Sequence, residues 1–297
     1  MANLKEVRTR ITSVNNTMQI TSAMKLVAAS KLKRAQDNIV QMRPYANKLY
    51  EILENISQSQ DGSDDDSNLM IDKEPTKVLL ILISSNRGLC GSFNTTVIRQ
   101  ATKLIDEKYQ AQFKAGNLSL MTVGKKVFEH FERRNFNIVA NHSSLWDDLN
   151  FAAVNTISEK LIEEFEEGKY DRIEIIYNQF KNAASQIIQS EQFLPIVKDD
   201  DLEESQENNM NIDYIFEPNT AEILEQLRPK ILKVQFYKAI LDSNASEHGA
   251  RMTAMHQATE NAGEMLDALK LEYNKARQAS ITKELLEIVA GAEALNS

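Results

Sequence analysis

The sequence predicts an α/β protein in which a long antiparallel coiled coil of N- and C-terminal helices carries an inserted Rossmann-like α/β domain. Three observations predict this fold: an apolar seam near the N-terminus, a second seam in the last third of the chain, and alternating strand and helix patterns between them. Helices at opposite ends of a chain can pair only if the middle brings the second back to the first, so an antiparallel hairpin is expected.

In the first helix, apolar residues recur at alternating steps of three and four residues, the spacing of a helix that supercoils around a partner. Two neighbouring seam positions, Thr21 and Lys25, interrupt the apolar set. A hydroxyl and a charge weaken coiled-coil packing, so we expect them to control register or to contact something other than the partner helix. The seam positions are Leu4, Val7, Ile11, Val14, Met18, Thr21, Lys25, Ala28, Leu32, Ala35, Ile39, Met42, Ala46, Leu49, Leu53 and Ile56.

The last third of the chain repeats this rhythm from Leu224 to Ala276, and beyond Ala276 the register slips by one residue to Ile281 and Leu285. As continuous helices, the two segments would be about 80 Å and 115 Å long, far beyond the helix of an ordinary globular domain. Two amphipathic helices on separate bundles are the alternative that the pattern leaves open.

Between the seams, strand and helix patterns alternate, which predicts a largely parallel sheet with one antiparallel edge. The last helix is expected to start after the N-cap Asn219. The predicted strands are 78–83, 118–123, 137–140, 173–177 and 186–195, and the predicted helices are 94–109, 125–133 and 151–167. The expected segments are a helix at 1–57, an acidic linker at 58–76, the Rossmann-like domain at 77–198, an acidic linker with a short strand (214–216) at 199–217, and a helix at 218–297.

Composition limits the classes of function. The net charge is −9, and although the N-terminal helix is basic, no aromatic residues alternate with the basic ones, so nucleic acid is not an expected partner. No apolar run is long enough to cross a membrane, and no signal peptide is evident. The single cysteine, Cys90, fits a reducing compartment. A cytosolic or membrane-peripheral protein is therefore expected.

The best candidate for chemistry is the loop at 84–94, which follows the first predicted strand, where nucleotide-binding folds hold phosphate. Its glycines, Gly88 and Gly91, do not form GxGxxG, and no GK[ST] is present. A tight strand-to-helix turn is therefore favoured over a nucleotide site. The four histidines are scattered and predicted to face solvent or a partner, so no catalytic residue, cofactor or metal site is expected; they are His130, His142, His248 and His256.

Three blocks of sequence carry a resemblance. They are MQITSAMKLVAASK at 18–31, SNRGLCGSFN at 85–94 and YNKARQASITKEL at 273–285. They closely resemble the gamma subunits of rotary proton-translocating ATP synthases, and the resemblance runs from end to end of the chain. The helix–domain–helix order is also the architecture of that family.

The resemblance implies a central rotor stalk that transmits torque between the membrane c-ring and the alpha/beta catalytic head. The implied partners are the alpha and beta subunits, the epsilon subunit and the c-ring, with no nucleic acid and no direct membrane span. It also implies a non-catalytic subunit, peripheral to the cytoplasmic face of a bacterial plasma membrane. Two alternatives remain: a static coiled-coil scaffold with a degenerate nucleotide-binding domain, and a nucleotide-dependent enzyme with a helical arm.

The resemblance also implies residue roles. It assigns contacts with the beta subunit to Met24, Lys25, Arg277, Gln278 and Thr282. At the end of the last helix, small residues stand beside large apolar ones, which suits a low-friction bearing, although a frayed helix end fits the pattern as well. The apolar bearing residues would be Leu285, Ile288 and Val289.

Overall fold

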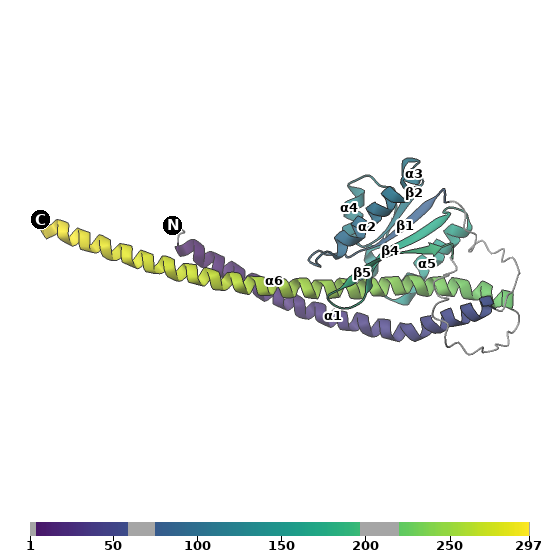
Figure 1. Ribbon diagram of the computed structural model, residues 1–297, viewed down its shortest axis with the longest axis horizontal. Helices are drawn as coiled ribbons and strands as arrows, with labels where there is room; N and C mark the ends of the chain where they lie inside the picture. Colours follow the sequence, from purple (N-terminus) through teal and green to yellow (C-terminus); the bar gives the residue numbers. More distant parts are fainter. Residues whose placement is uncertain (1–3, 59–74, 197–219, 297) are drawn as a thin grey trace. The chain divides into compact units, whose positions relative to one another are not determined.

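The computed structural model describes residues 4–58, 75–196 and 220–296 (Figure 1). They belong to two compact units, one formed by Ser30–Ala250 and the other by Met1–Ala29 with Arg251–Ser297. The predicted strand at 214–216, the predicted N-cap Asn219 and nearly all of both acidic linkers lie outside the described residues.

Both predicted long helices are present, as α1 (Leu4–Gln58) and α6 (Thr220–Asn296). Every seam position of α1 from Leu4 to Leu49 is buried or half-buried. In the Ser30–Ala250 unit, Ala46 and Leu49 pack against Val234 and Ile231 of α6. Higher residue numbers on α1 thus meet lower numbers on α6, which confirms the antiparallel pairing.

Five strands form one sheet in the order β3-β2-β1-β4-β5. The first four pair in parallel, whereas β5 pairs antiparallel with β4, as predicted for one edge. The strands are β1 (Val78–Ile83), β2 (Leu118–Val123), β3 (Ile138–Asn141), β4 (Arg172–Phe180) and β5 (Gln186–Leu194). The strand β4 runs three residues beyond its predicted end, so the connection to β5 is a tight hairpin.

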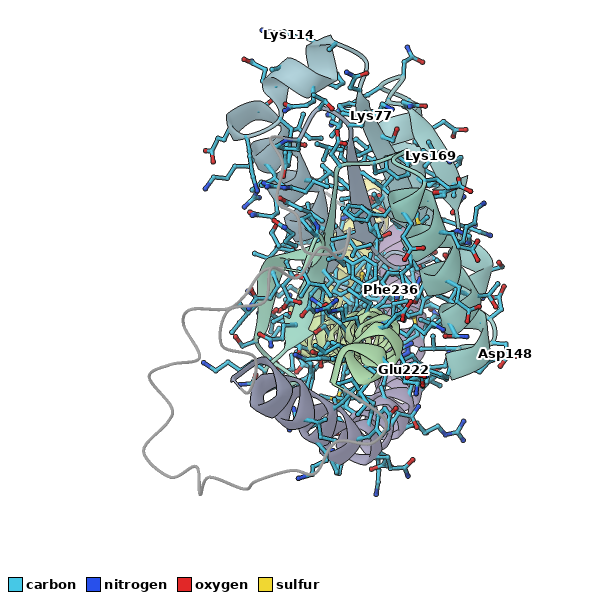
Figure 2. The ribbon with its side chains drawn as sticks, turned by 90° about the vertical axis from the view of Figure 1, so that its right-hand side faces the viewer. Lys77, Lys114, Asp148, Lys169, Glu222 and Phe236 are labelled. Carbon is cyan, nitrogen blue, oxygen red and sulfur yellow. The ribbon has the colours of Figure 1, made fainter. Side chains whose placement is uncertain are left out.

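Helices cover both faces of the sheet, which explains why all six residues of β1 are fully buried. On one face lie α2 (Phe93–Glu107) and α4 (Lys125–Glu132), and on the other lie α5 (Phe151–Glu166) and residues 232–240 of α6. Figure 2 shows Phe236 between α6 and the sheet, where its ring centroid lies 5.8 Å from that of Phe193 on β5. The long helix α6 is therefore part of the core of this unit.

The predicted helix at 94–109 is wrong at its C-terminal end. Helix α2 stops at Glu107, and a separate short helix, α3 (Gln110–Lys114), follows. Between them Tyr109 is buried, and its hydroxyl donates to the buried carboxylate of Glu174 on β4. The pattern also did not predict the 3₁₀ turn Ser143–Trp146.

Candidate partner-contact surfaces

The two polar seam residues of α1 meet polar residues of α6. The Lys25 ammonium lies 3.3 Å from Nδ1 of His256, and the Thr259 hydroxyl lies 2.8 Å from Oγ1 of Thr21. Thr21 donates its own proton to the carbonyl of Met18 at 3.0 Å. The predicted contact residue Lys25 is therefore half-buried and directed at the partner helix.

Beside Lys25, Met24 is half-buried, and large apolar side chains around it point outward from α1. Ile20, Leu26 and Val27 are all more than half exposed. These three lie off the coiled-coil seam, and sequence reasoning missed them as contact candidates. The signal was present, since three apolar residues off the seam within eight positions exceed what a solvated helix face needs.

The second group of predicted contact residues lies on α6. Arg277, Gln278 and Thr282 are all exposed, and the Thr282 hydroxyl donates to the carbonyl of Gln278 at 3.0 Å. At a rise of 1.5 Å per residue, Arg277 lies about 30 Å along α6 from His256. The structure thus does not bring the Met24–Lys25 group and the Arg277 group into one site. They are two separate surfaces of one helix pair.

At the end of α6, the predicted bearing residues are strongly exposed: Leu285 by 58%, Ile288 by 67% and Val289 by 56%. Leu286 is exposed to a similar extent. The register slip after Ala276 therefore marks the point where α6 stops burying its apolar face. An exposed apolar helix face of this size is typical of a surface that binds another protein.

The loop at 84–94 has its polar side chains bonded to one another. Asn94 accepts a hydrogen bond from the backbone N–H of Ser85 at 3.0 Å and donates to Cys90 Sγ at 3.2 Å. Leu89 and Gly91 adopt left-handed backbone conformations, with φ of 63° and 58°. The geometry is that of a rigid turn, with Cys90 and Phe93 packed against Ala250 of α6.

A close approach of two strand ends fixes the base of this loop. A Cβ added at Gly124, which follows β2, would lie 2.2 Å from the carbonyl oxygen of Ser84, which follows β1. Only glycine fits there. On the other side, Gly249 of α6 lies against the β4–β5 hairpin, where a Cβ would meet the carbonyl oxygen of Ala183 at 3.1 Å. Residues of α6 thus pack over the carboxyl ends of the parallel strands, where a Rossmann fold binds its ligand.

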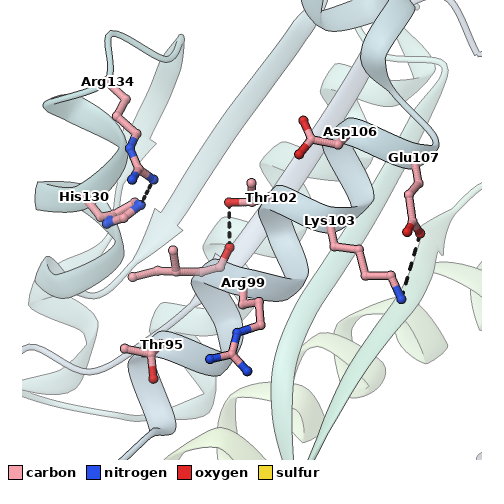
Figure 3. A pocket seen from close by; sticks show the side chains of 9 residues that line it. Thr95, Arg99, Thr102, Lys103, Asp106, Glu107, His130 and Arg134 are labelled. Atoms are coloured by element: carbon pink, nitrogen blue, oxygen red, sulfur yellow. Dashed lines mark hydrogen bonds and ion pairs between the residues drawn. The ribbon is translucent and has the colours of Figure 1, made fainter.

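A groove between α2 and α4, which sequence reasoning missed, is shown in Figure 3. Its volume is about 580 Å³, and Arg99, Lys103 and Arg134 contribute cations to it. Arg134 donates to Nε2 of His130, and burial, together with Arg134 and Arg133, lowers the pKa of that imidazole. Asp106 and Glu107 also line the groove, and Glu107 lies 4.0 Å from Lys103, so the charged lining is mixed.

Residues 4–58, 75–196 and 220–296 contain no cluster of metal-binding side chains. Over the same ranges, no helix has the length and apolar character needed to span a membrane.

Comparison with known proteins decides the family. A family model described as ATP synthase matches residues 3–295. The chain is 54% identical over 296 residues to the ATP synthase gamma chain of Christiangramia forsetii, a match that covers 100% of both chains. It is 55% identical over 297 residues to that of Flavobacterium psychrophilum, covering 99% of each. The chain belongs to the ATP synthase gamma-chain family.

A solved structure agrees with this gamma-chain assignment at the level of the fold. The chain resembles one in the Euglena gracilis mitochondrial ATP synthase, in an assembly of OSCP, F1 and c-ring in rotational state 3. The TM-score is 0.66 at 20% identity, over 98% of this chain and 94% of that one. The predicted family and the helix–domain–helix fold of gamma chains are therefore confirmed, while the roles of individual contact residues remain predictions.

Proposed function

We propose that this chain is the central rotor stalk of a proton-translocating ATP synthase. It transmits torque between a membrane c-ring and a catalytic head of alpha and beta subunits. Full-length identity above 50% to two bacterial gamma chains supports the role, as does the fold shared with a chain from an assembly of F1 and c-ring. ATP is made or hydrolysed on the beta subunits, and this chain acts on them mechanically.

The observation that carries the proposal is the exposed end of α6. Five large apolar side chains, Ile281, Leu285, Leu286, Ile288 and Val289, are between 49% and 67% exposed on one continuous helix. Burying such side chains gains roughly 1.5 to 3 kcal/mol each, so a helix that leaves all of them in water is built for a partner. A ring of alpha and beta subunits around the helix would supply that cover.

Torque transmission requires a stiff element, and paired helices supply it. Leu32, Ala35 and Ile39 are buried on the α1 seam, as are Ile231 and Val234 on α6. Two helices packed along such a seam resist bending and twisting more than one helix does, because each deformation must also break side-chain packing. The sheet, packed on α6 through Phe236, gives the stalk a rigid body to which further subunits can attach.

Coupling to catalysis requires an asymmetric shaft. A shaft that contacts three chemically identical beta subunits differently stabilises a different conformation of each one. A bias of about 5.5 kcal/mol shifts a two-state equilibrium from 1:99 to 99:1. We assign such contacts to the surface around Met24 and Lys25 and to the exposed Arg277, Gln278 and Thr282. Leu285, Ile288 and Val289 would form an apolar bearing.

The remaining assignments concern attachment and location. We assign the binding of the epsilon subunit and the c-ring to the Rossmann-like domain. The proposed division of the chain is into segments at 1–57, 58–76, 77–198, 199–217 and 218–297. The assembled chain would be peripheral to the cytoplasmic face of a bacterial plasma membrane, since its proposed membrane contact is a protein ring.

The test is reconstitution with the alpha and beta subunits of the same synthase. We expect copurification in one complex and proton pumping driven by ATP hydrolysis in inverted membrane vesicles. Met24→Lys should lower the protons pumped per ATP because it adds a cation at the proposed beta contact, whereas Gln41→Lys, at an exposed position of the same helix, should not. Unchanged coupling in Met24→Lys would remove Met24 from the contact surface.

Two alternatives are separated by simple measurements. A nucleotide-dependent enzyme with a helical arm would bind nucleotide as the isolated chain, which equilibrium dialysis with labelled ATP detects. A static scaffold would join the complex without turning in it. The contacts of α6 at this end of the sheet favour the rotor over the enzyme, because Ala250 packs against Cys90 and Phe93 of the loop that would have to hold phosphate.

A further inference from the structure

The contacts of Thr21 and Lys25 form one continuous polar layer across the helix pair of the unit Met1–Ala29 with Arg251–Ser297. Thr259 donates to Thr21, and one turn away Lys25 faces His256. The layer extends to Glu260, whose Oε1 lies 3.5 Å from Nε2 of His256. Thr21 is only 8% exposed, so its hydroxyl depends on protein partners rather than on water.

Hydrogen-bond donors and acceptors are matched across this layer. An ammonium group can only donate, so the contact with Lys25 makes Nδ1 of His256 an acceptor. The proton of a neutral imidazole then sits on Nε2, the nitrogen that faces Glu260. Thr21 donates to the Met18 carbonyl, and the single proton of the Thr259 hydroxyl is shared between Thr21 Oγ1 at 2.8 Å and the Met255 carbonyl at 2.7 Å. Each group has a complementary neighbour only when the helices are staggered as observed.

The rest of the seam in this unit specifies the stagger weakly. Next to the polar layer it contains methionines and alanines, namely Met18, Ala28, Met255 and Ala262, and farther along it contains larger apolar residues such as Val7 and Leu266. Methionine adapts to many packings, and the alanine side chain is too small to favour one packing over another. A slip of one heptad, about 10 Å, would keep apolar residues against apolar residues along most of these positions.

We propose that this polar layer is a register lock, which sets the stagger of α1 against α6. A slip of one heptad would place Thr21 against Leu266 and Lys25 against Gly263, so that neither polar group meets its complement. The slipped state is then disfavoured by loss of these polar contacts between the helices rather than by loss of apolar packing. Buried polar residues at coiled-coil seams act by this route where they fix register.

The stagger of the helices also sets the distance between the two predicted beta contacts, a step that rests on the proposed rotor function. The surface around Met24 and the exposed Arg277 lie on different helices, so their separation along the shaft depends on the stagger. A slip of one heptad would move one contact surface past the other by about 10 Å. Thr259 and His256 are therefore positioning residues for both predicted beta contacts.

The experiment reads the stagger directly by disulfide cross-linking of the full-length chain without partners. Val14 and Leu266 lie one heptad from Thr21 and Thr259, so Val14→Cys with Leu266→Cys reports the observed register. Val14→Cys with Tyr273→Cys reports the slipped one. The native Cys90 is buried and stays in place. The parent chain should form the first cross-link and little of the second.

In an apolar variant, Thr21→Val, Lys25→Met, His256→Leu and Thr259→Val, the ratio of slipped to observed cross-link should rise about twofold to tenfold, the change expected for loss of one ordinary hydrogen bond between the helices. The control Met18→Leu with Met255→Leu alters the same seam without polar groups and should keep the parent ratio. An apolar variant that cross-links only in the observed register would overturn the proposal.

If the apolar variant fails to fold, a variant that exchanges Lys25 and His256 tests the register lock instead. Lys25→His with His256→Lys keeps both groups of the pair but exchanges their helices, so it should retain the parent ratio. A swap in which the slipped cross-link predominates would also overturn the lock. Because no beta subunit is present, these results are independent of the predicted beta contacts, which the Met24→Lys coupling measurement tests separately.

Discussion

Residues 231–250 and 281–292 of α6 belong to one helix and are both rich in apolar side chains, yet they differ in what covers those side chains. In the first stretch, Leu232 and Phe236 pack into the core of the sheet, while Ile231 and Val234 pack against α1. In the second, every residue is exposed. A substitution in the first stretch should therefore change the stability of the chain itself, and one in the second should change only what the chain does with a partner.

The largest expected effect comes from a substitution in the first stretch. Phe236→Ala removes a fully buried ring from the core between α6 and the sheet, which costs about 3 to 5 kcal/mol of unfolding free energy. Ile288→Ala, at a residue that is 67% exposed, should change it by less than about 0.5 kcal/mol. Urea unfolding of the isolated chain, followed by circular dichroism, compares the two. Equal effects would mean that the two stretches do not differ as described.

The second prediction concerns a charge in the buried stretch. Burial raises the pKa of Asp242 to about 6, against the opposing effects of Lys238 and Arg43 and with a small contribution from Glu191. Because the folded pKa lies above the unfolded value of 3.8, the stability due to the protonated carboxyl is lost as pH rises from about 4 to 6. Above pH 6 the charged carboxylate costs about 3 kcal/mol.

Asp242→Asn removes this titration and keeps the shape of the side chain. The variant should therefore be more stable than the parent at pH 7.5, with an advantage that shrinks as the pH is lowered through 6 toward 5. Urea unfolding at several pH values measures the difference. A constant difference across this range would show that Asp242 is not the titrating group.

The third prediction concerns a residue near the exposed end of α6. Arg277→Ala should leave the unfolding free energy of the isolated chain unchanged, because the side chain is exposed. In the assembled complex the same change should cost about 1.5 to 3 kcal/mol, the value of one buried charge-assisted hydrogen bond, and slow multisite ATP hydrolysis. Lys270→Ala, which removes an exposed ion pair with Asp267, is the matched control. Parent turnover in Arg277→Ala would contradict its predicted role.

The smallest expected effect compares two glycines of α6. Replacing a helical glycine with alanine where the new Cβ meets no other atom typically stabilises by up to about 1 kcal/mol, and a Cβ at Gly263 would meet nothing within 4 Å. At Gly249 the new Cβ would lie 3.1 Å from the carbonyl oxygen of Ala183, so the same change should gain less or destabilise. Thermal unfolding of the two variants gives the sign of each change in stability. An equal gain at both sites would show that the β4–β5 hairpin moves away from the new Cβ at little cost.

Much of the fold could be predicted because apolar periodicity is a local signal. The run Val78–Ile83 reads as a buried strand by itself, and the seams of α1 and α6 read as helices that pair. The break between α2 and α3 could not be predicted from the sequence, because it depends on a hydrogen bond from Tyr109 to Glu174, which is 65 residues away in the chain. Helical propensity alone continues through that position.

The candidate surfaces were predictable to a lesser degree. The interruptions at Thr21 and Lys25 were visible, but their partners Thr259 and His256 were not, because the pattern gives the spacing on each helix and not the stagger between the helices. The groove between α2 and α4 was missed because Arg99 and His130 come from helices that only the folded sheet brings together. The exposure of Leu285 and Ile288 likewise depends on where α1 begins.

The central claim, that this chain is a rotor, is tested most directly by watching it turn. A bead attached through Lys114→Cys on the exposed helix α3 would report motion of the chain in a complex whose alpha and beta subunits are fixed to glass. The native Cys90 is buried and would not carry the bead. With ATP, the bead should rotate in one direction in three steps per turn, one for each catalytic subunit. ATP hydrolysis at the parent rate with a bead that never rotates would contradict the account.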